Sequence, residues 1–216
     1  PDLAVLMPDR PGHGYSGRPA RSDTLKVQAD QMAGVLEQTL SGTQQAVVVG
    51  HSYGGAVALR LALDHPDLVK AVVLLAPVAH DWGGCGEAWY NTAAGVPVLG
   101  LAFSQFAPIA GPSMAESGIK GVFEPQPAPE DYIETSGLEL LFRPGEFRAN
   151  AKDVNALMDE LGAQQERYPS LDIPVVVFSG LGDTVIKPEL HVGKLHHQVK
   201  DIRVIEYTDV GHMPHH

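Results

Sequence analysis

The sequence is poor in cysteine, in long apolar runs and in positive charge, and each shortage excludes a class of protein. Its single cysteine, Cys85, has no partner for a disulfide within the chain, and we interpret it as an ordinary thiol in a reducing, cytoplasmic compartment. No apolar run approaches the roughly 18 residues of a membrane-spanning helix. The net charge of −11 repels phosphate backbones, so we do not expect nucleic acid as a partner.

Short runs of β-branched and aliphatic residues alternate along the chain with stretches of helical periodicity, at about 25–40 and 54–64. Continuous apolar runs of this length are typical of buried parallel strands. The pattern predicts an α/β fold, in which a mostly parallel sheet carries helices on both faces. The predicted strands are Leu3–Met7, Ala46–Val49, Val72–Leu75, Val175–Ser179 and Arg203–Tyr207.

The stretch between the third and fourth of these strands has a different character. Residues 78–170 hold most of the aromatic residues and much of the excess of acidic over basic residues. We interpret these acidic residues as a solvated surface. No run within this stretch resembles a central strand. We therefore predict a core of residues 1–77 and 171–216, interrupted by a mostly helical insertion of residues 78–170.

The most specific motif is Gly50-His51-Ser52-Tyr53-Gly54, which matches the pattern G-x-S-x-G. A predicted strand precedes it and a predicted helix follows, which is the context of a nucleophile elbow. We expect glycine on both sides of Ser52 because the turn is too tight for side chains there. The turn strains Ser52 and exposes its hydroxyl, which still needs a base to accept its proton.

Two later turns supply an acid and a histidine. Asp183 lies in the turn after the strand Val175–Ser179, and His212 follows the last predicted strand. Both positions lie beyond the carboxyl ends of strands, where open α/β sheets place their sites. The order serine, acid, histidine is that of enzymes that use this elbow. Asp209 lies close to His212 in the sequence and could replace Asp183, but we favour Asp183.

The chain resembles the α/β-hydrolase superfamily, in the capped branch that contains many bacterial esterases. The resemblance implies that Ser52 attacks the substrate, that His212 acts as general base and acid, and that Asp183 orients His212. It also implies that residues 78–170 are the cap of the family. Four segments carry the resemblance in the expected order: Asp9–Ser16, Gly50–Gly55, Gly180–Asp183 and Gly211-His212.

An oxyanion hole needs two backbone N–H donors. We expect one from Tyr53, the residue after the nucleophile, and the other from a loop that precedes the strand Leu3–Met7 in the family. Only Pro1 and Asp2 precede this strand, and the chain stops soon after His212, where the family has a final helix. We therefore expect a chain that is truncated at both ends relative to the family.

The remaining histidines are not expected to take part in catalysis. His13 and His51 flank glycine turns, and we assign them structural roles. Five of the others could suggest a metal, but their spacing does not suit one helical face and couples them to no cysteine or carboxylate, so we predict no metal site. They are His191, His196, His197, His215 and His216.

These observations predict a hydrolase that cleaves a carboxylic ester of a small or medium, mostly apolar molecule through an acyl-serine intermediate. No metal or organic cofactor is expected, and the expected partner is the small-molecule substrate. Other serine chemistry of the superfamily stays open, namely that of lactonases, thioesterases, amidases, carbon–carbon bond hydrolases and cofactor-free haloperoxidases. A noncatalytic ligand receptor on the same scaffold is the alternative from another class.

Overall fold

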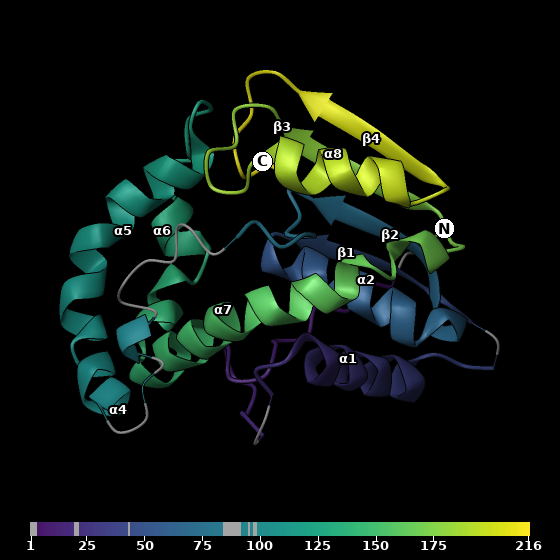
Figure 1. Ribbon diagram of the computed structural model, residues 1–216. Helices are drawn as coiled ribbons and strands as arrows, with labels where there is room; N and C mark the ends of the chain where they lie inside the picture. The colour runs from purple at the N-terminus through teal and green to yellow at the C-terminus, as the bar shows by residue number, and fades with distance from the viewer. Residues whose placement is uncertain (1–3, 20–21, 43, 84–91, 95, 97–98) are drawn as a thin grey trace.

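The computed structural model describes residues 4–19, 22–42, 44–83, 92–94, 96 and 99–216, and Cys85 lies outside them. A parallel sheet with the strand order β1-β2-β3-β4 forms the centre of the molecule (Figure 1). Val72 of β2 lies beside Val175 of β3, although more than a hundred residues of the chain separate them. The strands are β1 (Ala46–His51), β2 (Val69–Leu75), β3 (Val175–Gly180) and β4 (Ile202–Tyr207).

The predicted first strand does not form. Residues 4–7, the described part of the run Leu3–Met7, are irregular, and the side chains of Val5 and Met7 are 76% and 87% exposed. A strand is stable only beside a neighbour that accepts and donates its backbone hydrogen bonds. None of the four described strands pairs with this segment, and β1 is therefore an edge strand. The apolar run alone predicted a strand because periodicity does not reveal whether a neighbour exists.

Three helices pack on one face of the sheet. Alternate residues of a strand point to the same face, and Leu74 of β2 and Val177 of β3 share a core with side chains from all three helices. Val47 and Val49 of β1 point to the other face and are 54% and 61% exposed. The sequence predicts helices on both faces, and these three helices cover one. They are α1 (Leu25–Thr39), α2 (Tyr53–Asp64) and α8 (Pro188–Gln198).

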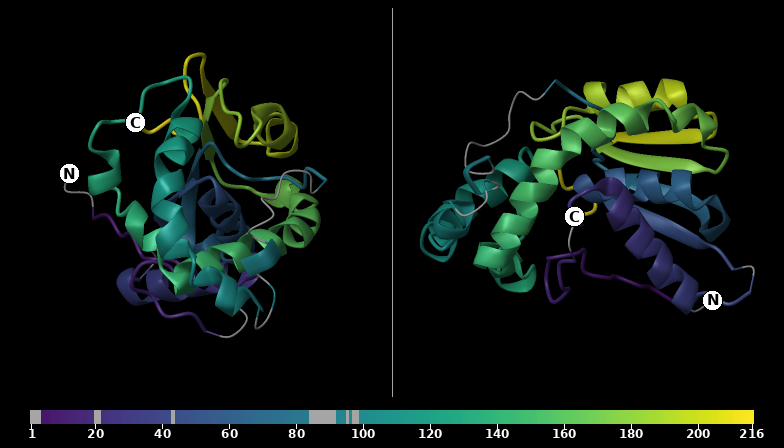
Figure 2. Two further views of the ribbon diagram at one scale, coloured as in Figure 1. Left: turned by 90° about the vertical axis from the view of Figure 1, so that its left-hand side faces the viewer. Right: turned by 60° about the horizontal axis from the view of Figure 1, so that its bottom comes forward.

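The stretch between β2 and β3 contains helices and, in its described residues, no strand. Figures 1 and 2 show α5 and α6 standing beside the carboxyl ends of the strands, whereas α7 runs from there back to the core. Leu157 and Leu161 of α7 pack with Leu25 of α1 and Ala56 of α2, so the last helix of the insertion is anchored in the core. Its helices are α4 (Leu99–Ser104), α5 (Ala107–Phe123), α6 (Tyr132–Thr135) and α7 (Pro144–Gln165).

Short 3-10 helices complete the described structure. They are η1 (Pro66–Leu68), η2 (Leu138–Phe142) and η3 (Tyr168–Ser170). None of the described helices has the length and apolar character needed to cross a membrane.

Candidate active site

Ser52 occupies a strained turn between β1 and α2. Its φ of 51° and ψ of −121° lie outside the regions that residues with a side chain prefer. Its backbone N–H donates to the carbonyl of Leu75 at 3.0 Å, and its carbonyl accepts from the N–H groups of Gly55 and Val78 at 2.9 and 3.0 Å. These three bonds hold Ser52 against the end of β2 and stabilise a conformation that costs of order 1–3 kcal/mol.

The two glycines around Ser52 differ in the space that a side chain would find. A Cβ atom at Gly50 would lie 2.3 Å from the carbonyl oxygen of Gly54, so no larger residue fits there. A Cβ atom at Gly54 would meet nothing within 4 Å. The expectation that a tight turn requires both glycines therefore holds for Gly50 and is wrong for Gly54.

Asp183 and His212 are in direct contact. The Asp183 carboxylate accepts from Nδ1 of His212 through Oδ2 at 2.7 Å, and from the backbone N–H groups of Val185 and Ile186 through Oδ1 at 2.8 and 2.9 Å. Both residues are only 5% exposed. A carboxylate at Nδ1 fixes the proton on that nitrogen and leaves Nε2 free to accept a proton.

The turn after β3 and the loop that carries His212 approach each other closely. A Cβ atom at Gly180 would lie 2.3 Å from the carbonyl oxygens of both Val210 and Gly211. The N–H of Gly182 donates to the Val210 carbonyl at 3.0 Å. Glycine at position 180 thus permits the backbone contact that brings Asp183 to His212.

His51 connects Ser52 to His212. Its Nε2 lies 2.8 Å from the carbonyl oxygen of His212, and the two imidazole centroids are 4.9 Å apart. Burial lowers the pKa of His51 to about 4, which keeps the ring neutral at neutral pH. A carbonyl only accepts, so Nε2 of the neutral ring carries the proton and donates it. The residue before the candidate nucleophile therefore binds the backbone of the candidate base.

Asp209 has different surroundings from Asp183. It is exposed, and its carboxylate accepts from the Thr208 hydroxyl at 3.4 Å. Of the two acids that the sequence offers, the structure places Asp183 against His212. The structure thus brings together Asp183 and His212, and it places Ser52 next to His51, which contacts both the His212 ring and its carbonyl oxygen.

Tyr53 is the first residue of α2, where backbone N–H groups have no acceptor within the helix. Its side chain turns to another part of the molecule. The hydroxyl accepts from Nε2 of Gln28 at 2.9 Å, and the Arg10 guanidinium lies 4.3 Å from the centre of the ring. Burial raises the pKa of the Tyr53 phenol, which remains protonated.

A buried ion cluster beside Tyr53 joins the insertion to the chain before α1. The Asp153 carboxylate of α7 accepts from Arg10 at 2.8 Å, from Arg18 at 2.7 Å and from His13 at 3.1 Å. Its side chain is 1% exposed. Asp153 was not among the residues predicted from the sequence, although a signal was present. Asp153 falls on the buried stripe of α7, between Ala149 and Leu157, where an acid needs a partner.

The other predicted histidines make separate contacts. His191 is buried in α8, where its Nδ1 accepts from the N–H groups of Ala79 and His80 at 3.2 Å each, and burial lowers its pKa to about 4. His215 and His216, near the chain end, make edge contacts with the rings of His51 and Phe123, respectively. Within the part of the chain that the structure describes, no three His, Cys, Asp or Glu side chains converge as metal ligands would.

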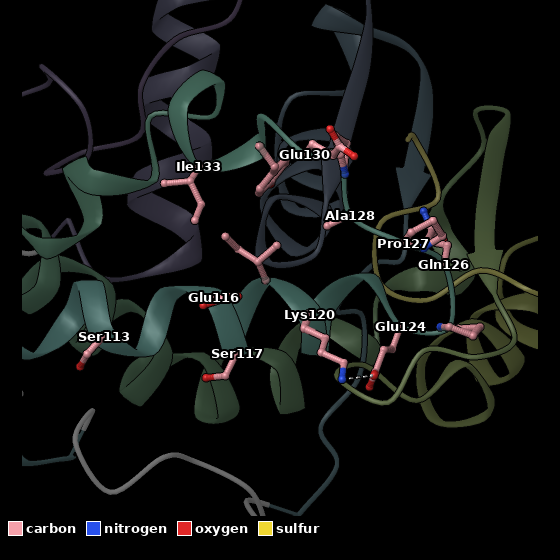
Figure 3. A pocket seen from close by; sticks show the side chains of 14 residues that line it. Ser113, Glu116, Ser117, Lys120, Glu124, Gln126, Pro127, Ala128, Glu130 and Ile133 are labelled. Atoms are coloured by element: carbon pink, nitrogen blue, oxygen red, sulfur yellow. Dashed lines mark ion pairs between the residues drawn. The ribbon is translucent and has the colours of Figure 1, made fainter.

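A cavity of about 770 Å³ lies in the insertion, between α5 and residues 124–133. Figure 3 shows Ser113 towards one end of this cavity, and Glu124 and Gln126 towards the other. Ser52, Asp183 and His212 do not line it. Gln126, however, hydrogen-bonds the loop that carries His212.

Comparisons with known proteins concern the fold and the sequence. A family model described as alpha/beta hydrolase fold matches residues 2–100. A 2-hydroxymuconate semialdehyde hydrolase from Pseudomonas putida is 38% identical over 92 residues, which are 41% of this chain and 32% of that protein. The lipase LipV from Mycobacterium tuberculosis is 43% identical over 77 residues, which are 36% of this chain and 28% of that protein. The match thus spans about a third of the length of these curated relatives.

The likeness in structure extends over nearly the whole chain. The crystal structure of a serine hydrolase from Cycloclasticus zankles, a bacterium that degrades polyaromatic hydrocarbons, superposes with a TM-score of 0.69 at 18% identity. The superposition covers 94% of this chain and 71% of that one. The family model over residues 2–100 and the likeness in structure agree that the chain has the α/β-hydrolase fold.

Proposed function

We propose that this protein is a serine hydrolase that cleaves carboxylic esters, with Ser52 as nucleophile, His212 as general base and acid, and Asp183 as the group that orients His212. The observation that carries the proposal is the 2.7 Å bond between the buried Asp183 and Nδ1 of His212, on a loop bound by the neighbour of Ser52. The strained backbone of Ser52 agrees with a nucleophile elbow.

The reaction follows from these roles. Nε2 of His212 accepts the proton of the Ser52 hydroxyl as its oxygen attacks the ester carbonyl, and the Asp183 carboxylate stabilises the imidazolium that forms. The backbone N–H of Tyr53 stabilises the negative oxygen of the tetrahedral intermediate. His212 then gives its proton to the leaving alcohol, and an acyl group remains on Ser52. Water attacks this group in the same manner and releases the acid. The triad residues hold every proton in turn, so the scheme contains no metal or cofactor.

For the substrate class, we propose carboxylic esters of small or medium, mostly apolar molecules. The insertion, residues 78–170, would serve as a cap over the carboxyl ends of the strands, where Figure 1 places α5 and α6. The lipase among the relatives agrees with ester hydrolysis. The semialdehyde hydrolase favours a second candidate, in which the same triad acts on a semialdehyde substrate.

Replacement of the nucleophile tests the proposal. Ser52→Ala should lower the turnover of short-chain nitrophenyl esters by about 10⁶-fold, as loss of a triad member does in other serine hydrolases. It should also abolish covalent labelling by a fluorophosphonate, which mass spectrometry would locate on the peptide that contains Ser52. Ser41→Ala, an exposed serine in a loop, is the matched control and should behave like the wild type.

Two outcomes would contradict the proposal. A Ser52→Ala protein that keeps a tenth of the wild-type activity would remove Ser52 from the role of nucleophile. A wild-type protein that binds apolar carboxylic esters but neither turns them over nor reacts with the fluorophosphonate would be a ligand receptor on this fold. Faster turnover of a semialdehyde than of any ester would favour the second candidate, which keeps the same triad.

A further inference from the structure

We propose that Gln126, from the segment that follows α5, is a positioning residue that holds the His212 loop in its working geometry. This inference rests on the proposed function, because it gives Gln126 a role through His212. Under this inference, a residue of the insertion supports the candidate base in the core.

The side chain of Gln126 hydrogen-bonds the residues on both sides of His212. Its Oε1 accepts from the backbone N–H of Gly211 at 3.1 Å, and its Nε2 donates to the carbonyl of Met213 at 3.0 Å. The two bonds fix the orientation of the amide, because the N–H group can only donate and the carbonyl can only accept. An amide can donate and accept at the same time through two different atoms, and glutamine has the length that the structure shows.

Backbone contacts of the same segment support the two side-chain bonds. The N–H of His212 donates to the carbonyl of Val122 at 3.0 Å. A Cβ atom at Gly211 would lie 2.1 Å from the carbonyl oxygen of Glu124, so the segments touch through bare backbone. Met213 is buried against Phe123. The His212 loop therefore lies on the end of α5 and on the residues that follow it.

The position of a general base decides how well it works. The bond from Nδ1 to Asp183 orients the imidazole ring, but it leaves the backbone of His212 to be fixed by other groups. His51 fixes it from the core and Gln126 from the insertion. Loss of a positioning contact that displaces a reacting group by about 1 Å can cost about a hundredfold in rate. Gln126 also lines the cavity in Figure 3, so one side chain contacts both that space and the His212 loop.

The experiment compares three variants of the full chain. Gln126→Met keeps the length of the side chain and removes both bonds. Gln126→Glu keeps the bond from Gly211 and loses the bond to Met213, because an ionised carboxylate only accepts. Gln105→Met is the matched control, since Gln105 is an exposed glutamine of the insertion whose side chain bonds the carbonyl of Leu101 in its own segment.

We expect kcat to fall about 10- to 100-fold in Gln126→Met, with KM and the free energy of unfolding close to those of Gln105→Met. Gln126→Glu should lie between Gln126→Met and the wild type. A merely structural side chain would instead lower the free energy of unfolding and leave kcat unchanged.

Values of kcat within twofold of the wild type in both Gln126 variants would overturn the inference, as would a loss that the Gln105→Met control shares. If Gln126→Met does not fold, Gln126→Glu decides through its kcat, and a value within twofold of the wild type counts against the inference. The proposed function fails separately. A His212→Ala protein that stays active removes the triad, whereas an inactive His212→Ala protein beside fully active Gln126 variants removes only the role of Gln126.

Discussion

Two buried carboxylates in this molecule each touch a histidine, yet their surroundings are opposite. Asp183 contacts His212 and two backbone N–H groups. Asp153 contacts His13 and, in addition, the guanidinium groups of Arg10 and Arg18. The side chains of both acids are 1% exposed.

The difference teaches that a buried aspartate beside a histidine is not by itself a mark of catalysis. The charge of Asp153 is balanced by two permanent cations, Arg10 and Arg18. The contacts of Asp183 are with dipoles and with one titratable ring, so a positive charge that forms on His212 is the natural complement of this carboxylate. The count of permanent cations around the acid separates the two cases.

The largest effect should come from Asp183. Asp183→Asn keeps the size of the side chain but favours the wrong tautomer of His212, and we expect a loss of up to about 10⁴-fold in kcat. Asp209→Asn is the matched control and should change kcat little, because Asp209 is exposed and bonded to Thr208. Ester hydrolysis by the purified variants measures both. A larger loss in Asp209→Asn than in Asp183→Asn would reverse our assignment of the acid.

Asp153 should matter for stability more than for chemistry. Asp153→Ala leaves Arg10 and Arg18 without their carboxylate, and breaking a buried pair in this way costs about 3–5 kcal/mol. We expect the lower end, because the two guanidinium groups are 25% and 20% exposed and water screens them.

Urea unfolding of Asp153→Ala would give this free energy directly. Asp159→Ala, an exposed acid on the same helix, is the control and should cost less than about 0.5 kcal/mol. An equal loss of stability in both variants would show that the ion cluster adds nothing to the fold.

Acid should produce the smallest effect and again distinguish Asp153. Burial alone raises the pKa of Asp153, but the bond from His13 and the charges of Arg10 and Arg18 outweigh it and hold the pKa below its ordinary value. The ionised form therefore stabilises the fold fully above the unfolded-state pKa of about 3.9, and this contribution is lost as the pH falls through the lower folded-state pKa.

We therefore expect the free energy of unfolding to fall more steeply below about pH 4 in the wild type than in Asp153→Asn, which has no proton to bind at this position. Urea unfolding at a series of acidic pH values measures the two slopes. Parallel slopes would mean that Asp153 has the same pKa in the folded and unfolded states.

The sequence predicted those parts of the molecule that depend on local pattern. Four of the predicted apolar runs form β1 to β4. The order of serine, acid and histidine along the chain pointed to Ser52, Asp183 and His212, and the structure shows Asp183 and His212 in contact. The run Leu3–Met7 misled us, because pairing with a neighbour decides whether a strand forms. Asp153 and Gln126 were missed because their partners lie far away in the chain, at Arg10 and at the His212 loop, and only the folded backbone brings them together.

The bond from His51 to the His212 carbonyl has a mechanical consequence. His51 and Ser52 are adjacent residues at the end of β1, so a bending motion of this strand moves the serine and the tether of the histidine together. We therefore expect the distance between Ser52 and His212 to change little when the sheet bends. The insertion holds the same loop from the opposite side, through Gln126 and Val122. A displacement of the insertion would therefore move His212 more than it moves Ser52.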